Sequence, residues 1–214
     1  MTPRDFVNDL AAIRLPRVFN PYADRCPIHD LSDAPFRRRL NLQTYLEQAI
    51  SCKATSVWVA RDLGYRGGRR TGIAMTDEAH LGHASQIFGR IELERATKGP
   101  AVAERTAANV WKVLSVLNRP VVLWNVFPLH PHEAEDPMSN RCHTRIERES
   151  TMPLFSALLK LLRPQEVVAI GRDAAVALAN ISPTVVNVRH PSYGGQADFE
   201  TGLYNLYNVR ADLS

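Results

Sequence analysis

The sequence predicts a three-layer α/β/α fold, in which helices cover both faces of a central, mainly parallel four-stranded sheet. Two observations carry this prediction. Short runs rich in Val, Ile and Trp alternate with helical segments, which favours right-handed crossovers between parallel strands. The runs also lack strict alternation of apolar and polar residues, as is typical of strands buried on both faces. The predicted strands are residues 55–59, 121–126, 167–170 and 185–188.

The segments between these predicted strands show the apolar spacing that is typical of helices. Residues 104–117 place Ala107, Val110, Trp111, Leu114 and Leu117 on one stripe. Further helices are predicted at residues 150–162 and 173–179, and an earlier one at 39–51. Residues 1–35 contain five prolines and predict an irregular N-terminal arm with one short helix at 5–13.

Length and composition limit the class of protein. A chain of 214 residues fits one domain, so residues 1–214 are treated as a single unit. With 45% hydrophobic and 22% charged residues, the chain is not of the disordered class. Its apolar runs are too short to span a bilayer, and its N-terminus does not resemble a signal peptide. Three cysteines indicate a reducing compartment, so we expect a cytoplasmic protein, associated with the nucleoid if the source is bacterial.

Basic residues are unevenly distributed along the chain. The net charge is +4, but residues 1–70 carry 12 basic and 7 acidic groups, a local charge of +5. Arginine supplies 22 of the 26 basic residues, and its planar guanidinium suits phosphate groups. A basic patch and an anionic partner are therefore expected; genome composition is an equal explanation for the arginine content.

Polar residues follow three of the predicted strands. Asp62 comes after the first strand, in a loop rich in Gly and Arg, Asn125 ends the second, and His190 follows the fourth. Gly171, after the third strand, is interpreted as a strand-to-helix turn. Ligand sites in parallel sheets lie at the carboxyl ends of the strands, so we expect Asp62, Asn125 and His190 to share one rim.

This constellation resembles the uracil-DNA glycosylase superfamily over most of the chain. Residues 60–65, Ala-Arg-Asp-Leu-Gly-Tyr, lead to residues 71–76, Thr-Gly-Ile-Ala-Met-Thr, at the spacing that separates Gly-Gln-Asp-Pro-Tyr-His from His-Gly-Leu-Ala-Phe-Ser in the best-known branch. Asn125 resembles the residue that reads uracil. Residues 190–192, His-Pro-Ser, resemble the DNA-intercalation loop, and residues 168–171 resemble the third-strand segment of several branches.

The resemblance implies an enzyme of base-excision repair that flips uracil out of DNA and hydrolyses its N-glycosidic bond. It implies that Asp62 positions the water and that His190 stabilises the departing uracil anion. No metal or cofactor is required, and a monomer suffices. The implied base-binding residues are Arg61, Gly64, Tyr65, Met75 and Asn125, and the implied DNA-binding residues are Arg66, Arg69, Arg70, Ser192, Tyr193 and Gly194.

The sequence also departs from the family pattern. Ala60 and Leu63 replace a Gly and a Pro, and Met75 replaces a stacking aromatic residue. Gly64 stands where the best-known branch has a Tyr that clashes with the thymine methyl, so thymine must be rejected by another residue, for which Tyr65 is a candidate. Tyr193 or Gln196 is expected to fill the gap left by the flipped base. The four cysteines of the iron–sulfur branches are absent from the sequence.

Two other readings remain open at this point. The departures at positions 60, 63 and 75 fit a non-catalytic module that binds DNA or a lesion on the same fold. The glycine at position 64 leaves room for another N-glycosidic substrate, such as a free nucleoside or a different deaminated base (hypoxanthine or xanthine). The histidines at positions 80, 83, 130 and 132 are expected at the surface rather than in a metal site.

Overall fold

The computed structural model describes residues 1–179 and 185–209. Its centre is a four-stranded sheet of order β3-β2-β5-β6, in which every neighbouring pair is parallel. The strands are β2 (Ser56–Asp62), β3 (Val121–Phe127), β5 (Glu166–Ile170) and β6 (Val185–Val188). The predicted sheet is confirmed, and β2 extends to include Asp62.

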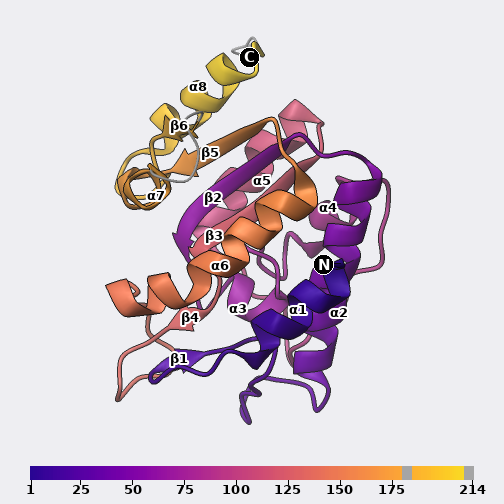
Figure 1. Ribbon diagram of the computed structural model, residues 1–214, viewed down its shortest axis with the longest axis vertical. Helices are drawn as coiled ribbons and strands as arrows, with labels where there is room; N and C mark the ends of the chain where they lie inside the picture. Colours follow the sequence, from indigo (N-terminus) through magenta and orange to yellow (C-terminus); the bar gives the residue numbers. More distant parts are fainter. Residues whose placement is uncertain (180–184, 210–214) are drawn as a thin grey trace.

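Helices flank this sheet, with α6 in front of it and α5 behind it in the view of Figure 1. The described chain contains these helices: α1 (Pro3–Ala12), α2 (Ala34–Ser51), α3 (Gly68–Thr71), α4 (Leu81–Gln86), α5 (Arg105–Leu117), α6 (Arg145–Leu162), α7 (Arg172–Leu178) and α8 (Gln196–Leu206). The three-layer α/β/α prediction is therefore confirmed.

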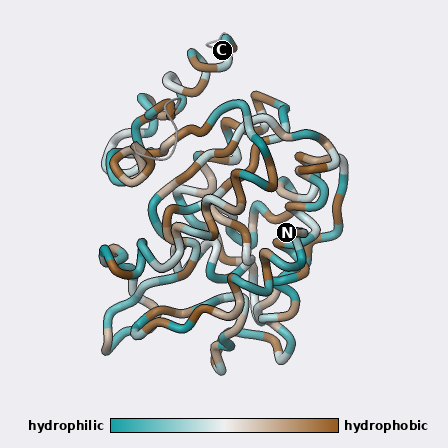
Figure 2. The backbone as a smooth tube through the Cα atoms, viewed as in Figure 1, coloured by the Kyte–Doolittle hydropathy of each residue, from teal (hydrophilic) through white to brown (hydrophobic). Residues whose placement is uncertain are grey.

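Burial explains why the two central strands lack alternation. All seven residues of β3 are buried, as are the first five of β2. Trp58 and Trp124, one from each strand, are almost completely inaccessible. Figure 2 shows hydrophobic stretches within the body of the fold and hydrophilic stretches along outer loops and helix ends. Among the described residues, no helix is both long and apolar enough to cross a membrane.

Several helices differ from the predicted ones at their ends. Helix α6 begins five residues earlier than predicted, because Thr144 accepts the backbone N–H of Glu147 and the Glu147 side chain accepts that of Thr144. Helix α2 begins at Ala34, within the segment predicted to be irregular, with a proline in its first turn. Helices α3, α4 and α8 were not predicted. The two short ones have too few residues for periodicity, and α8 buries only Phe199 and Leu203.

The N-terminal segment belongs to the core. Phe6, Val7 and Leu10 of α1 are buried, and the Phe6 ring lies 5.5 Å from that of Trp124. Farther along, β1 (Val18–Phe19) pairs antiparallel with β4 (His130–Pro131). Neither two-residue strand was predicted, since so short a pairing leaves no pattern in the sequence.

A buried ion pair anchors the loop that follows β2. Arg38 of α2 is inaccessible, and its Nη2 lies 2.6 Å from Asp30 Oδ1. Arg38 Nε also donates to the backbone oxygen of Arg70. Tyr22 donates its hydroxyl to the backbone oxygen of Gly72, whose φ of +80° and close approach to Arg38 leave no room for a side chain. Buried polar contacts from Arg38 and Tyr22 therefore fix the backbone of the loop that follows β2.

Candidate active site

Asp62 and Asn125 meet at the carboxyl edge of the sheet. The register pairs Ala60 with Asn125, and Asn125 Nδ2 donates to the backbone oxygen of Asp62 at 3.0 Å. Asn125 is 1% exposed, and its Oδ1 has no hydrogen-bond partner among the described residues. Trp124 Nε1 is the only other buried side-chain polar atom in the described part of the chain that lacks a partner. An unpaired buried acceptor carries a free-energy cost, so Asn125 Oδ1 marks a place where a ligand can donate a hydrogen bond.

The carboxylate of Asp62 lies between two nitrogen groups. Its Oδ2 is 2.7 Å from Arg61 Nε, and its Oδ1 is 2.5 Å from His143 Nδ1. The side chains of Asp62 and His143 are 9% and 8% exposed. The His143 ring also packs beside Phe127, with ring centroids 5.6 Å apart. Both oxygens of Asp62 are thus fixed in place, and the carboxylate is ordered before any substrate binds.

His143 was missed as a site residue by the sequence analysis. It lies in the irregular segment between β4 and α6, 81 residues after Asp62. It does not follow a strand directly, and no motif marks it. Sequence position alone gives no signal for this contact.

Arg61 connects two carboxylates. Besides Asp62, its guanidinium contacts Asp173 of α7, with Nη1 2.6 Å from Oδ2. In this structure Arg61 orients Asp62 through an ion pair. Direct contact between Arg61 and the base stays a prediction.

His190 follows β6 and presents a defined tautomer. The backbone N–H of Ser192 donates to its Nδ1 at 3.1 Å, so the proton of the neutral ring is on Nε2. Burial, and then the charges of Arg61 and Arg189, lower the pKa of His190 below its usual value. The ring is therefore neutral at pH 7 and has an N–H to donate. Gly171, with φ of +88°, packs directly against it, which explains the glycine that was predicted there as a turn.

The glycine-rich loop after β2 is covered by a residue that the sequence analysis did not single out. A Cβ atom on Gly64 or on Gly67 would overlap with the carboxylate of Glu104. The backbone N–H of Tyr65 donates to Asn140 Oδ1 at 3.0 Å. Met75 is 5% exposed and has a φ of +49°. These contacts set the shape of the loop; roles of Gly64, Tyr65 and Met75 in base binding stay predictions.

Two arginines predicted to bind DNA are instead structural, and that prediction is wrong for both. Arg69 is 4% exposed, with its guanidinium 3.9 Å from the Phe19 ring centroid and hydrogen-bonded to the backbone oxygen of Pro137. Arg70 is 7% exposed, and its Nε lies 2.8 Å from Glu78 Oε2. Both guanidinium groups are engaged by partners inside the fold, and neither is available at the surface. Arg66, by contrast, is exposed.

His130 is another correction, since it is buried rather than at the surface. Its Nδ1 lies 3.0 Å from Arg69 Nη1, and its Nε2 lies 2.8 Å from the backbone oxygen of Ser139. Burial, and then the charge of Arg69, lower the pKa of His130 to about 3. The neutral His130 ring therefore connects Arg69 to the backbone of Ser139 through hydrogen bonds.

The turn after His190 exposes a large aromatic side chain. Tyr193 is 99% exposed and has a φ of +53°, and Gly194, with φ of +77°, follows it. Ser192, Tyr193 and Gly194 form the turn that leads into α8. A fully exposed tyrosine in a left-handed conformation is unusual; roles of Ser192, Tyr193 and Gly194 in DNA binding stay predictions.

Comparison with known proteins now identifies the family. Residues 65–210 match the uracil DNA glycosylase superfamily. The chain belongs to this superfamily. The match begins three residues after Asp62, so it covers Asn125 and His190 but not the end of β2. Family membership supports a DNA glycosylase, a hydrolase of N-glycosyl bonds.

The fold of this superfamily member is also seen in a solved structure. The crystal structure of wild-type SMUG2 from Pedobacter heparinus matches with a TM-score of 0.62 and 12% sequence identity. The match covers 98% of this chain and 97% of that one. At this identity the likeness shows the fold alone. No curated protein sequence matches the chain.

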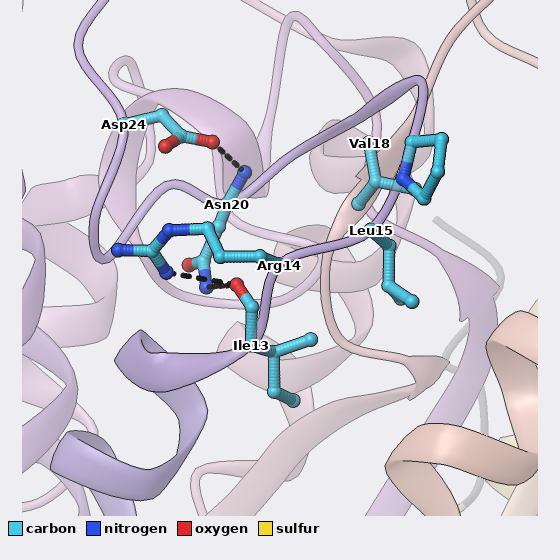
Figure 3. Close-up of a pocket in the computed structure, with 7 residues that line it drawn as sticks. Ile13, Arg14, Leu15, Val18, Asn20 and Asp24 are labelled. Carbon is cyan, nitrogen blue, oxygen red and sulfur yellow. Dashed lines mark hydrogen bonds between the residues drawn. The ribbon is translucent and has the colours of Figure 1, made fainter.

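A hollow elsewhere on the surface does not contribute to this site. It has a volume of about 370 Å³ and is lined by Ile13, Arg14, Leu15, Pro16, Val18, Asn20 and Asp24 (Figure 3). Its polar groups bond to one another: Arg14 donates to the backbone oxygen of Ile13, and the Asn20 N–H donates to Asp24. None of the residues at the carboxyl edge of the sheet lines it.

Proposed function

We propose that this glycosylase removes uracil from DNA by hydrolysis of the N-glycosidic bond, as a monomer and without a metal or cofactor. One observation carries the proposal: Asn125 holds an unpartnered buried acceptor, and its Nδ2 donates to the backbone oxygen of Asp62, so the two residues lie next to each other. A base-reading group and a water-positioning group thus share one rim of the sheet. His190 approaches the same rim from β6 with an N–H to donate.

Asn125 supplies the discrimination between uracil and cytosine. Its Oδ1 accepts a hydrogen bond from N3–H of uracil. Cytosine has a lone pair at N3, so the same acceptor would face another acceptor in a buried site. Such a mismatch costs several orders of magnitude in specificity when no alternative partner is available.

Asp62 and His190 act on opposite sides of the bond that breaks. The Asp62 carboxylate orients a water molecule, offsets positive charge that develops on the sugar, and takes the proton that the water loses. The water oxygen bonds to C1′ while the bond from C1′ to N1 breaks, and the electron pair leaves on uracil. His190 Nε2–H donates to the resulting anion, a type of stabilisation worth roughly 10²–10³ in rate.

Tyr193 is the residue best placed to hold DNA open. The flipped nucleotide leaves a gap in the base stack, and an exposed aromatic ring can fill it by stacking. Gln196, the other candidate for this position, donates to Glu200 Oε1 at 3.0 Å. Full exposure of the Tyr193 ring favours the tyrosine.

A cleavage assay on a labelled oligonucleotide with one uracil tests the proposal. The strand is presented single or paired to G or A, with EDTA present, and abasic sites are broken by alkali. We expect scission at uracil, and a loss of roughly 10²–10⁴ in rate for Asp62→Asn. Glu135→Gln, a change at an exposed acid, is the matched control.

Other outcomes of this assay would contradict the proposal in distinct ways. Scission only at hypoxanthine or xanthine would establish a glycosylase for another deaminated base. Tight binding of uracil-containing DNA with no scission at high protein concentration would indicate a non-catalytic lesion-binding module.

A further inference from the structure

Glu104 occupies the space that a side chain at position 64 would otherwise fill. Its Oε1 covers the Cα of Gly64, and its Oε2 covers that of Gly67, so the carboxyl group lies across two glycines of the loop that begins at Asp62. Any larger residue at either glycine would displace it. The Glu104 carboxyl group therefore occupies the space that is left by the missing side chains of both glycines, and the conformation of the loop depends on it.

The backbone of Glu104 is fixed, while its carboxyl group keeps its hydrogen-bonding capacity. Glu104 is the N-cap residue of α5, yet its side chain makes no capping bond. Its backbone N–H donates to Asp77 Oδ2 at 2.5 Å. Within residues 1–179 and 185–209, neither carboxyl oxygen of Glu104 has a hydrogen-bond partner. A polar group so placed, and only partly exposed, is available to a ligand.

The surroundings of Glu104 favour its neutral form. Burial, and then the nearby negative charge of Asp77, raise the pKa of Glu104 to about 7, against an opposing effect of Arg66. Asp77 is inaccessible and its Oδ1 lies 2.7 Å from His80 Nδ1. Near neutral pH a substantial share of the molecules therefore carries a carboxylic acid at this position.

We propose that Glu104 is a specificity-determining residue of the base site, and that its carboxyl group donates a hydrogen bond to the base carbonyl oxygen next to the ring N–H that Asn125 reads. This inference rests on the proposed function and deepens it. Deamination replaces an exocyclic amino group by a carbonyl and adds a hydrogen to the neighbouring ring nitrogen. Asn125 Oδ1 accepts that ring N–H, and Glu104 donates to the carbonyl beside it.

The two groups together select a class of bases. Uracil, hypoxanthine and xanthine all present a carbonyl next to a ring N–H, as do thymine and guanine, so this pair of contacts rejects cytosine and adenine while thymine and guanine must be excluded by the shape of the site. Cytosine and adenine present an amino group next to a ring lone pair, so both contacts would become repulsive. An ionised Glu104 would repel the carbonyl oxygen, so excision of deaminated bases weakens as this residue loses its proton.

Rates of single-turnover excision between pH 5.5 and 9 test this proposal with the wild-type protein and Glu104→Gln. For the wild type we expect the rate on uracil to fall about tenfold per pH unit above about 7, because only the protonated form donates. The amide of Glu104→Gln always donates, so its rate stays level from pH 7 to 9 and exceeds the wild-type rate at pH 9. Glu135→Gln is the control and retains the wild-type profile.

A thermal readout accompanies the kinetics and does not depend on activity. Glutamine removes a buried charge, so the midpoint of unfolding of Glu104→Gln should exceed that of the wild type at pH 8.5 and match it at pH 4.5. An equal midpoint at both pH values would overturn the proposal, because Glu104 would then ionise as an exposed acid does.

The kinetic outcomes separate this inference from the proposed function. If the wild type excises uracil and Glu104→Gln follows the same pH profile, the role of Glu104 is wrong and the uracil glycosylase stands. If the wild type excises no deaminated base at any pH, the proposed function fails, and the role of Glu104 fails with it.

Discussion

His143 Nδ1 lies 2.5 Å from Asp62 Oδ1, which joins the last residue of β2 to the segment before α6. The contact is almost closed to solvent, and Arg61 holds the other oxygen of the same carboxylate. Asp62 therefore has one orientation available to it. In the proposed mechanism His143 is a positioning residue, since it contacts Asp62 and would act on the water only through that carboxylate.

Replacement of His143 by Ala is expected to slow excision by roughly 10²-fold, the scale of a misplaced catalytic group. Affinity for uracil-containing DNA should change by less than about twofold, because the His143 side chain is only 8% exposed. Single-turnover rates and a binding titration measure the two effects. His132→Ala is the control. A proportionate loss of affinity and rate would show that the change disrupts the fold of the site rather than the orientation of Asp62.

Substitution of His190 by Ala should lower the single-turnover rate by roughly 10²–10³, the value of one lost donor to a developing anion. The lowered pKa of His190 adds a pH prediction. Because the pKa is lowered, His190 stays mostly neutral down to pH 6.5. Protonation of His190 should therefore not reduce the wild-type rate between pH 7.5 and pH 6.5. A titration midpoint at or above 6.5, followed by NMR of the His190 ring, would contradict this.

The ring of Tyr193 is expected to matter for duplex DNA more than for single strands. Base–aromatic stacking is worth about 1–3 kcal/mol, so Tyr193→Ala should reduce excision from a U·G duplex by about tenfold or more. Single-stranded substrate has no stack to hold open and should lose much less. Tyr193→Phe keeps the ring and serves as the control. Equal losses on both substrates would assign the wedge to another residue.

Loss of the buried pair of Arg38 and Asp30 should destabilise the protein strongly. Asp30→Ala leaves the Arg38 guanidinium inaccessible and without its carboxylate, a change that costs about 3–5 kcal/mol. Urea unfolding followed by circular dichroism measures it. Asp33→Ala removes an exposed ion pair with Arg37 and should have a far smaller effect. Similar midpoints for the two variants would mean that the loop after β2 is not anchored by this pair.

The sequence was sufficient to predict the sheet and the rim, for a physical reason. The central strands are buried on both faces and leave continuous apolar runs, so Asn125 at the end of one of these runs must lie at the carboxyl edge. Strand β6 is partly exposed, but its valines still mark a strand, and His190 follows it within two residues. The contact of His143 with Asp62 and that of Glu104 with Gly64 join distant segments through side chains, and no local pattern encodes them. The arginines show the opposite failure: Arg66, Arg69 and Arg70 look alike in a charged loop, but only the structure reveals which guanidinium groups have buried partners.

The packing of Phe6 against Trp124 has a consequence for the order in which the molecule is assembled. These residues are 124 − 6 = 118 positions apart, and Trp124 immediately precedes Asn125. During synthesis α1 is made long before β3, so its apolar face cannot pack against Trp124 until β3 has been made. Contacts of such long separation form late and slowly. The strand that carries Asn125 is thus packed by a helix made more than a hundred residues earlier, and a variant without α1 would lack the part of the core formed by Phe6, Val7 and Leu10.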